Sequence, residues 1–199
     1  MKHLPLFLAA MALIPASATF AQQKGIEGEV APPLHADNWI NLPEGEAGLI
    51  VEEGAPGIDL KKYRGKVIVL KFFQSWCEAC QKRSFPKLQK LVEHYEGNDK
   101  VQFIAVQTVF EGLADNTAAK LQPTADKFGL KIPFGHSVKL PNIPNVNMDY
   151  KTGGTPWWIV INKDGIVEFN GHYIDFDKAI INLDELIAAS ASTTATDSE

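Results

Sequence analysis

One stretch decides how the chain is interpreted: Val67-Ile-Val-Leu-Lys-Phe-Phe-Gln-Ser-Trp-Cys-Glu-Ala-Cys80. Its apolar part, residues 66–74, has the length and the β-branched composition of a buried strand. Beyond the cysteines, apolar residues recur at three- and four-residue spacing from Phe85 to Tyr95, as on an amphipathic helix. Cys77 and Cys80 are therefore expected where a strand passes into a helix, with Cys77 at or just before the helix start.

The start of a helix changes the chemistry of a thiol placed there. Its unpaired N–H groups and the positive end of the helix dipole both favour an anion. We therefore expect the pKa of the Cys77 thiol to fall below its ordinary value of about 8.5. Cys80 lies one turn further along, within reach of a disulfide. This spacing indicates that Cys77 attacks and that Cys80 resolves the mixed disulfide.

Two other uses of the cysteine pair are less consistent with the sequence. A bridge across two residues closes so small a loop that it restricts the unfolded chain little, so it is a poor structural staple. A zinc site needs about four ligands, and the histidines available as further ligands are scattered: His35, His94, His136 and His172. The pattern favours a redox-active disulfide, and neither a metal nor another cofactor is expected.

Composition and the N-terminus bear on partners and location. The 199 residues are enough for one domain with a sizeable core, and a net charge of −5 without a basic stripe argues against a nucleic-acid partner. Residues 1–21 have the pattern of a secretory signal peptide, with cleavage after Ala18 or Ala21. The protein is therefore expected to be periplasmic or secreted. An uncleaved anchor in the inner membrane, facing the periplasm, is the alternative.

The rest of the chain alternates between strands and helices. Residues 22–57 are interrupted by proline and glycine and should form an irregular lead-in, with short edge strands at most, over 39–40 and 49–51. Residues 190–199 have the composition of a disordered tail. Between them, strands are expected over 66–74, 101–109, 131–138, 156–162 and 166–170, and helices over 77–96, 117–128 and 175–189. This order predicts an α/β fold with a central mixed sheet and helices on both faces.

Three motifs in this order resemble the thioredoxin superfamily, and within it the exported TlpA/ResA-type thiol-disulfide oxidoreductases. They are Trp76-Cys-Glu-Ala-Cys80, Gly153-Gly-Thr-Pro156 and Lys163-Asp-Gly165. The resemblance covers residues 58–189 and implies a thioredoxin-like domain there. It further implies a cis Thr155–Pro156 bond and a client-binding surface made by Trp76, Thr155 and Pro156, where Thr155 offers its backbone to an extended peptide.

The resemblance implies reduction of disulfides in client proteins, with a thiol electron donor in the membrane restoring the dithiol. Two alternatives remain open. One is a peroxidase of the peroxiredoxin kind, although Gln74 and Leu70 stand where that family has its active-site Thr or Ser and its Pro. The other is a non-enzymatic carrier of Cu(I) on the two thiols. The sequence indicates neither the client nor the oligomeric state.

Two charged residues near the cysteines are expected to tune the thiol pKa values in opposite directions. Glu78 adjoins Cys77 and disfavours its thiolate, which makes the couple more reducing. Lys71 stands where thioredoxins place a buried acid, and a cation below the site would make the couple more oxidising. Strand alternation alone leaves open whether the Lys71 side chain points to the cysteines or reaches the surface. A further departure from many relatives is Ala79, where they have Pro.

Overall fold

The structure, a computed structural model, describes residues 25–43, 57–138 and 145–189. The strands among these residues are β1 Leu34–His35, β2 Asp37–Ile40, β3 Gly57–Ile58, β4 Val67–Phe73, β5 Val101–Val109, β6 Phe134–Val138, β7 Trp157–Ile161 and β8 Val167–Gly171. The α-helices are α1 Phe85–His94, α2 Leu121–Lys127, α3 Val146–Asp149 and α4 Phe176–Ala188. Short helices of other types are η2 Leu60–Tyr63, η3 Cys80–Ser84 and η4 Ala118–Lys120.

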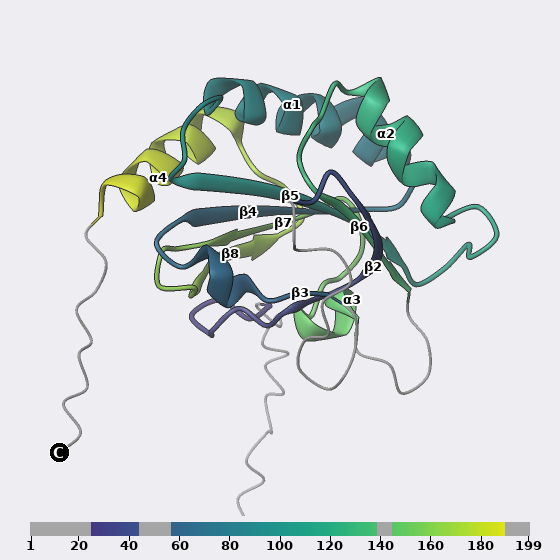
Figure 1. Cartoon of the computed structure of the whole chain (residues 1–199), viewed down its shortest axis with the longest axis horizontal. Coiled ribbons are helices and arrows are strands. Elements are labelled where there is room, and N and C mark those ends of the chain that lie inside the picture. The colour runs from purple at the N-terminus through teal and green to yellow at the C-terminus, as the bar shows by residue number, and fades with distance from the viewer. Residues whose placement is uncertain (1–24, 44–56, 139–144, 190–199) are drawn as a thin grey trace, which may run out of the picture.

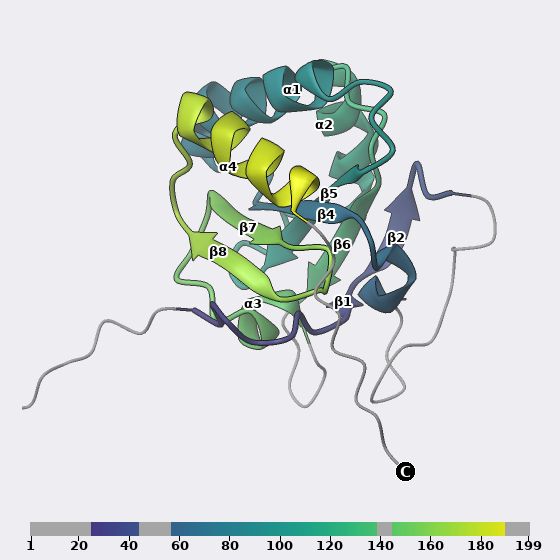
Figure 2. The same cartoon turned by 90° about the vertical axis from the view of Figure 1, so that its left-hand side faces the viewer.

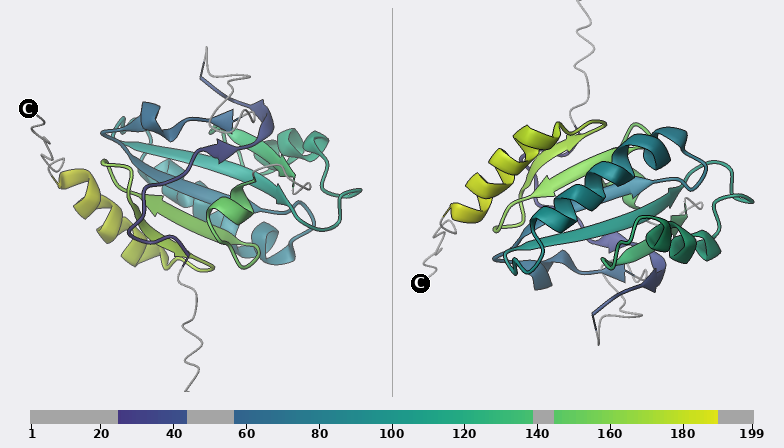
Figure 3. Two further views of the ribbon diagram at one scale, coloured as in Figure 1. Left: turned by 90° about the horizontal axis from the view of Figure 1, so that it is seen from below. Right: turned by 90° about the horizontal axis from the view of Figure 1, so that it is seen from above.

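A mixed sheet in the order β2-β6-β5-β4-β7-β8 lies at the centre of the described residues (Figure 1). Helices α1, α2 and α4 cover one face, and α3, η2 and the N-terminal segment lie on the other (Figures 1 and 2). Figure 3 shows the two faces separately, with the three longer helices on the upper one. The predicted α/β fold of thioredoxin type, with a mixed sheet between helices on both faces, is confirmed.

Strand β4 is the central element of this sheet. It pairs in parallel with β5 and antiparallel with β7, so both of its edges are hydrogen-bonded. All seven of its residues are buried. A strand covered on both faces has no need of polar alternation, which explains the continuous apolar run in the sequence. The strand is one residue shorter at each end than the predicted 66–74.

Side chains alternate between two hydrophobic cores along β4. Val69 and Phe73 point to the upper core, which also contains both cysteines and the apolar face of α1. Ile68 and Phe72 point to the lower core, where the Phe72 ring meets the edge of Tyr150 at 5.5 Å between centroids. The sheet is thus fixed from both sides at the end that carries the cysteines.

The N-terminal segment contains the edge strand expected over 39–40, as part of β2, and it also contributes to the core. Strand β2 pairs antiparallel with β6 and forms one edge of the sheet. Leu34 is fully buried, in the lower core. The expected signal peptide 1–21, the possible strand 49–51 and the expected tail 190–199 lie outside the described residues. Within the part of the chain that the structure describes, no helix has the length and apolarity required to cross a bilayer.

Other predicted elements are present with shifted ends. Strand β6 begins at Phe134 and not at 131, because Pro133 precedes it and cannot donate to a ladder. Helix α4 begins as expected, with the Asp175 carboxylate accepting the Lys178 N–H at 3.1 Å. The predicted helix 117–128 starts as η4 and continues as α2.

We expect Phe85→Ala to lower the free energy of unfolding by about 3–5 kcal/mol. Phe85 is fully buried, and its ring stacks on Phe128 at 4.7 Å and meets Phe73 at 4.9 Å between centroids. Urea denaturation of the oxidised protein measures the loss. Ile181→Ala, at a side chain 57% exposed, is the control and should change stability by less than about 0.5 kcal/mol. Equal effects of the two substitutions would contradict this placement of the core.

Candidate active site

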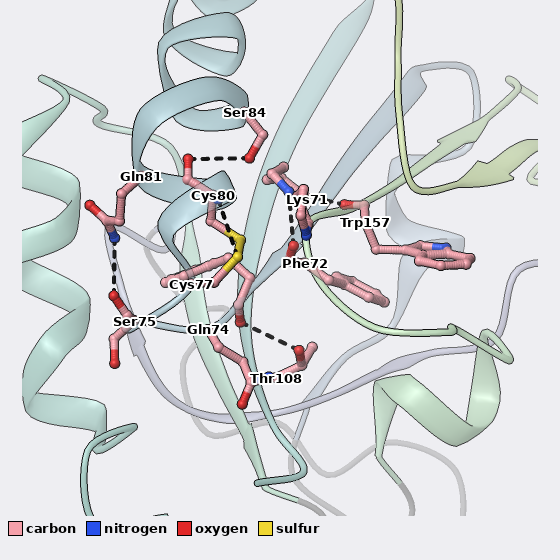
Figure 4. The surroundings of a disulfide bond; sticks show 12 residues. Lys71, Phe72, Gln74, Ser75, Cys77, Cys80, Gln81, Ser84, Thr108 and Trp157 are labelled. Carbon is pink, nitrogen blue, oxygen red and sulfur yellow. Dashed lines mark hydrogen bonds between the residues drawn. A yellow bond between two sulfur atoms is a disulfide. The ribbon is translucent and has the colours of Figure 1, made fainter. Parts of the chain in front are cut away.

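The two cysteines form a disulfide at the start of the helix that follows β4, with their Cα atoms 5.2 Å apart (Figure 4). The Cys77 carbonyl accepts the N–H of Gln81 at 3.0 Å, so the helical hydrogen bonds begin at Cys77, as predicted. The backbone N–H of Cys80 donates to the Cys77 sulfur at 3.2 Å. An N–H of the first turn is therefore directed at the sulfur, where it stabilises negative charge.

The two sulfurs differ in access. Cys80 is fully buried, whereas Cys77 keeps 5% of its surface exposed and lines an open groove of about 630 Å³. Thr155 also lines this groove, as does Trp76, which is 50% exposed. A partner molecule can therefore reach Cys77 but not Cys80. The three sequence-predicted residues Trp76, Cys77 and Thr155 are brought together at one surface.

Pro156 lies beside this groove. The Thr155–Pro156 peptide bond is cis, as the resemblance predicted. The carbonyl of Pro156 accepts a hydrogen bond from Nδ1 of His172 at 2.8 Å. Trp157 and Trp158 face opposite sides of the sheet: Trp158 is buried in the upper core, and Trp157 packs against the lower one.

The helix after the cysteines is not the continuous one predicted over 77–96. Residues 78–79 are α-helical, residues 80–84 form the wider π-type turn η3, and α1 continues from Phe85. The Phe85 N–H reaches back to the carbonyl of Cys80, five residues earlier. Pro86 explains the interruption, because it has no N–H and its ring displaces the carbonyl four residues before it. The Ser84 hydroxyl donates to the same Cys80 carbonyl at 3.3 Å.

Lys71 is fully buried, on the side of the disulfide that faces Trp157 in Figure 4, and does not reach the surface. Its amine donates to the carbonyls of Phe72 at 2.9 Å and Trp157 at 3.3 Å, and lies 4.8 Å from the centroid of the Trp158 ring. No carboxylate pairs with it among the described residues. Burial lowers the pKa of the Lys71 amine well below its usual range, because the charged form loses its hydration.

Glu78, the other residue expected to tune the site, lies at the surface. Its carboxylate pairs with the amine of Lys82 at 2.5 Å, with 75% and 73% of the two side chains exposed. Lys82 thus offsets the negative charge next to Cys77, and water screens both charges. Among the described residues, no cluster of three or more His, Cys, Asp or Glu side chains could hold a metal ion.

Asn116 is a site residue that the sequence did not indicate. It is 1% exposed, and its carbonyl oxygen accepts the Ser75 N–H at 2.7 Å and the Ser75 hydroxyl at 2.8 Å. Its amide donates to Gln74 at 3.1 Å. The residues just before the cysteines are therefore fixed by a loop some 40 positions further on. Gly112 lies in this loop with φ of 63°, and a Cβ there would come within 3.1 Å of Trp76.

Residues 45–174 match the family model described as Redoxin. The chain belongs to the Redoxin family. Among curated proteins, thiol-disulfide oxidoreductase ResA of Bacillus thuringiensis is 30% identical over 110 residues, which cover 55% of this chain and 57% of ResA. The thioredoxin-like protein YneN of Bacillus subtilis is 24% identical over 133 residues, covering 62% of this chain and 72% of YneN.

Solved structures agree with this family assignment. A thiol-disulfide isomerase from Corynebacterium glutamicum superposes with a TM-score of 0.66 at 25% identity, covering 80% of this chain and 98% of its own. A thioredoxin-like superfamily protein gives 0.68 at 26% identity, covering 81% and 98%. This redoxin is thus similar to thiol-disulfide oxidoreductases and has two cysteines at disulfide distance. Both observations support redox activity.

We expect Lys71→Met to stabilise the protein near neutral pH, because the unfolded chain carries a solvated ammonium that the folded chain must bury. The folded-state pKa of Lys71 is lowered. The unfolded chain therefore binds more protons between the two pKa values, and wild-type stability rises there with pH by up to about 1.4 kcal/mol per unit. The advantage of Lys71→Met should shrink as pH rises toward about 10.

Urea denaturation of both proteins across this pH range measures the effect. Lys90→Met, at an exposed lysine of α1, is the control and should differ from the wild type by an amount that hardly varies with pH. A stability difference for Lys71→Met that is constant, or that widens with rising pH, would contradict the burial argument.

Proposed function

We propose that this redoxin reduces disulfide bonds in client proteins outside the cytoplasm, with Cys77 and Cys80 as its dithiol. The proposal rests on one observation: the Cys77 sulfur is both accessible to a partner molecule and placed where its thiolate is stabilised. Its sulfur lines an open groove and accepts an N–H from the first helical turn. Cys80, which only has to meet Cys77, is fully buried. A structural staple would need neither feature.

The chemistry begins with the reduced protein. The Cys77 thiolate attacks one sulfur of the client disulfide, forming a mixed disulfide, and the other client sulfur leaves as a thiolate that takes a proton from water. Cys80 then loses its proton and attacks the Cys77 sulfur, which releases the first client sulfur. Two electrons have passed to the client, and the protein is left with the disulfide seen in Figure 4.

Client binding is assigned to Trp76, Thr155 and Pro156. Thr155 lines the same groove as Cys77, and Pro156 next to it has no N–H, so Thr155 can offer its backbone to an extended peptide. Trp76 adds an exposed aromatic surface of the kind that anchors protein interfaces. The bound client would then present its disulfide to the accessible sulfur.

The reducing direction rests on the resemblance to the exported TlpA/ResA-type thiol-disulfide oxidoreductases, and the buried Lys71 does not oppose it. A fixed cation below the site would favour the thiolate and so the oxidising couple, but burial lowers the pKa of Lys71 and favours its neutral form. Glu78 adjoins Cys77 and adds no positive charge. After each turnover, a thiol electron donor in the membrane would restore the dithiol. The signal-peptide pattern of residues 1–21 supports a periplasmic or secreted location, or an inner-membrane anchor.

We expect Cys77→Ser to reduce insulin disulfides no faster than the uncatalysed rate, because the attacking thiolate is lost. Cys80→Ser should instead accumulate a mixed disulfide between Cys77 and the client, detectable by mass spectrometry. Native activity in Cys77→Ser would contradict the proposal. Turnover of hydrogen peroxide in preference to insulin would favour the peroxidase alternative.

Expression of the full chain in a Gram-negative host tests the location. We expect the protein in the periplasmic fraction, with a mature N-terminus at Thr19 or Gln22 by mass spectrometry. An intact N-terminus in the membrane fraction would favour the anchored alternative. An intact N-terminus in the cytoplasm would contradict export.

A further inference from the structure

A second groove, of about 360 Å³, adjoins the one that contains Cys77. The two are adjacent, because Ala79, Arg83 and Thr155 line both. The second groove runs between α1 and the Pro156 loop, with Lys87 on the helix side. A polypeptide whose cysteine lies at Cys77 would therefore continue into this groove with its neighbouring residues.

The second groove is positively charged. Arg83 and Lys87 line it, and the described residues that line it include no Asp or Glu. Lys82, nearby, already has a partner in Glu78, but neither Arg83 nor Lys87 forms an ion pair with a described carboxylate. This local charge is opposite in sign to the net charge of −5 of the whole chain.

Lys87 is held in position without being neutralised. Its amine donates to the carbonyl of Ile174 and lies 4.1 Å from the centroid of the Tyr173 ring. A carbonyl and an aromatic face orient an ammonium group but leave its full positive charge. Arg83 is exposed at the junction of the two grooves, where its planar guanidinium can bind a carboxylate through two parallel hydrogen bonds.

We propose that this groove selects client proteins with acidic side chains next to the reactive cysteine. The inference rests on the proposed function, since it names the class of client that the same site would reduce. Arg83 receives a carboxylate one or two residues from the client cysteine, and Lys87 attracts a second one. Opposite charge also speeds the encounter, an effect that falls as ionic strength rises.

Three synthetic peptides with the same internal disulfide test this preference. They differ only in the two residues that flank the attacked cysteine, which are Glu, Gln or Lys. The reduced protein is mixed with each peptide at low ionic strength, and the rate is followed by tryptophan fluorescence. Each rate is divided by that of dithiothreitol with the same peptide, which removes the intrinsic reactivity of the disulfide. We expect the order Glu, Gln, Lys, with about 10-fold between the extremes at low salt and little difference at high salt.

Variants of Arg83 show whether the groove causes the preference. Arg83→Gln should lower the Glu-to-Lys ratio, Arg83→Lys should largely keep it, and Arg83→Glu should bring it to one or below. Lys90→Gln removes a charge from the same helix outside the groove and should leave the ratio unchanged. Near-ultraviolet circular dichroism checks that each variant is folded.

The outcomes separate this inference from the proposed function. If the wild type reduces the Gln peptide but shows equal normalised rates for all three, the function stands and the charge preference is wrong. If the wild type reduces none of them, both fail. A ratio that falls equally in Lys90→Gln and Arg83→Gln would assign the preference to overall charge and overturn the role of the groove.

Discussion

The backbone N–H of Cys80 donates to the sulfur of Cys77, and most of the site depends on keeping that contact in place. Strand β4, which precedes the cysteines, is buried on both faces and hydrogen-bonded along both edges. It therefore holds the start of the helix in a fixed position. Asn116 fixes the turn between strand and helix, and Phe85 anchors the helix in the upper core. A sulfur in this setting gains an electrostatic partner at no cost of reorganisation when it becomes an anion.

The site is also strongly asymmetric. On the outer side, Cys77 opens into a groove bordered by Arg83 and an exposed Trp76. On the inner side, Cys80 and the amine of Lys71 are fully buried. The outer side provides access and charge for a partner, whereas the inner side provides a water-poor setting that disfavours free charge. Thiol-disulfide exchange needs both, because Cys77 must react with a partner disulfide while Cys80 stays shielded until it attacks the mixed disulfide.

Much of this architecture could be predicted from local sequence. The continuous apolar run before Trp76 predicted a buried strand, and the apolar periodicity from Phe85 to Tyr95 placed Cys77 at the helix start. The remaining features depend on contacts between distant residues. Burial of Lys71 depends on its position opposite Trp158 of the neighbouring strand β7, on the sheet face that the upper core covers. Asn116 acts through a fold that brings it to Ser75. Neither leaves a periodic signal. The sequence predicts one helix over 77–96 and does not predict the π-type turn before Pro86.

The most direct test is the pH dependence of cysteine alkylation in the reduced protein. Iodoacetamide is added across a range of pH, and mass spectrometry locates the modified residue. The account predicts rapid modification of Cys77 with a midpoint below about 8.5, the ordinary value for a thiol, and slow modification of Cys80. A Cys77 midpoint at or above that value, or equal reactivity of the two cysteines, would contradict it.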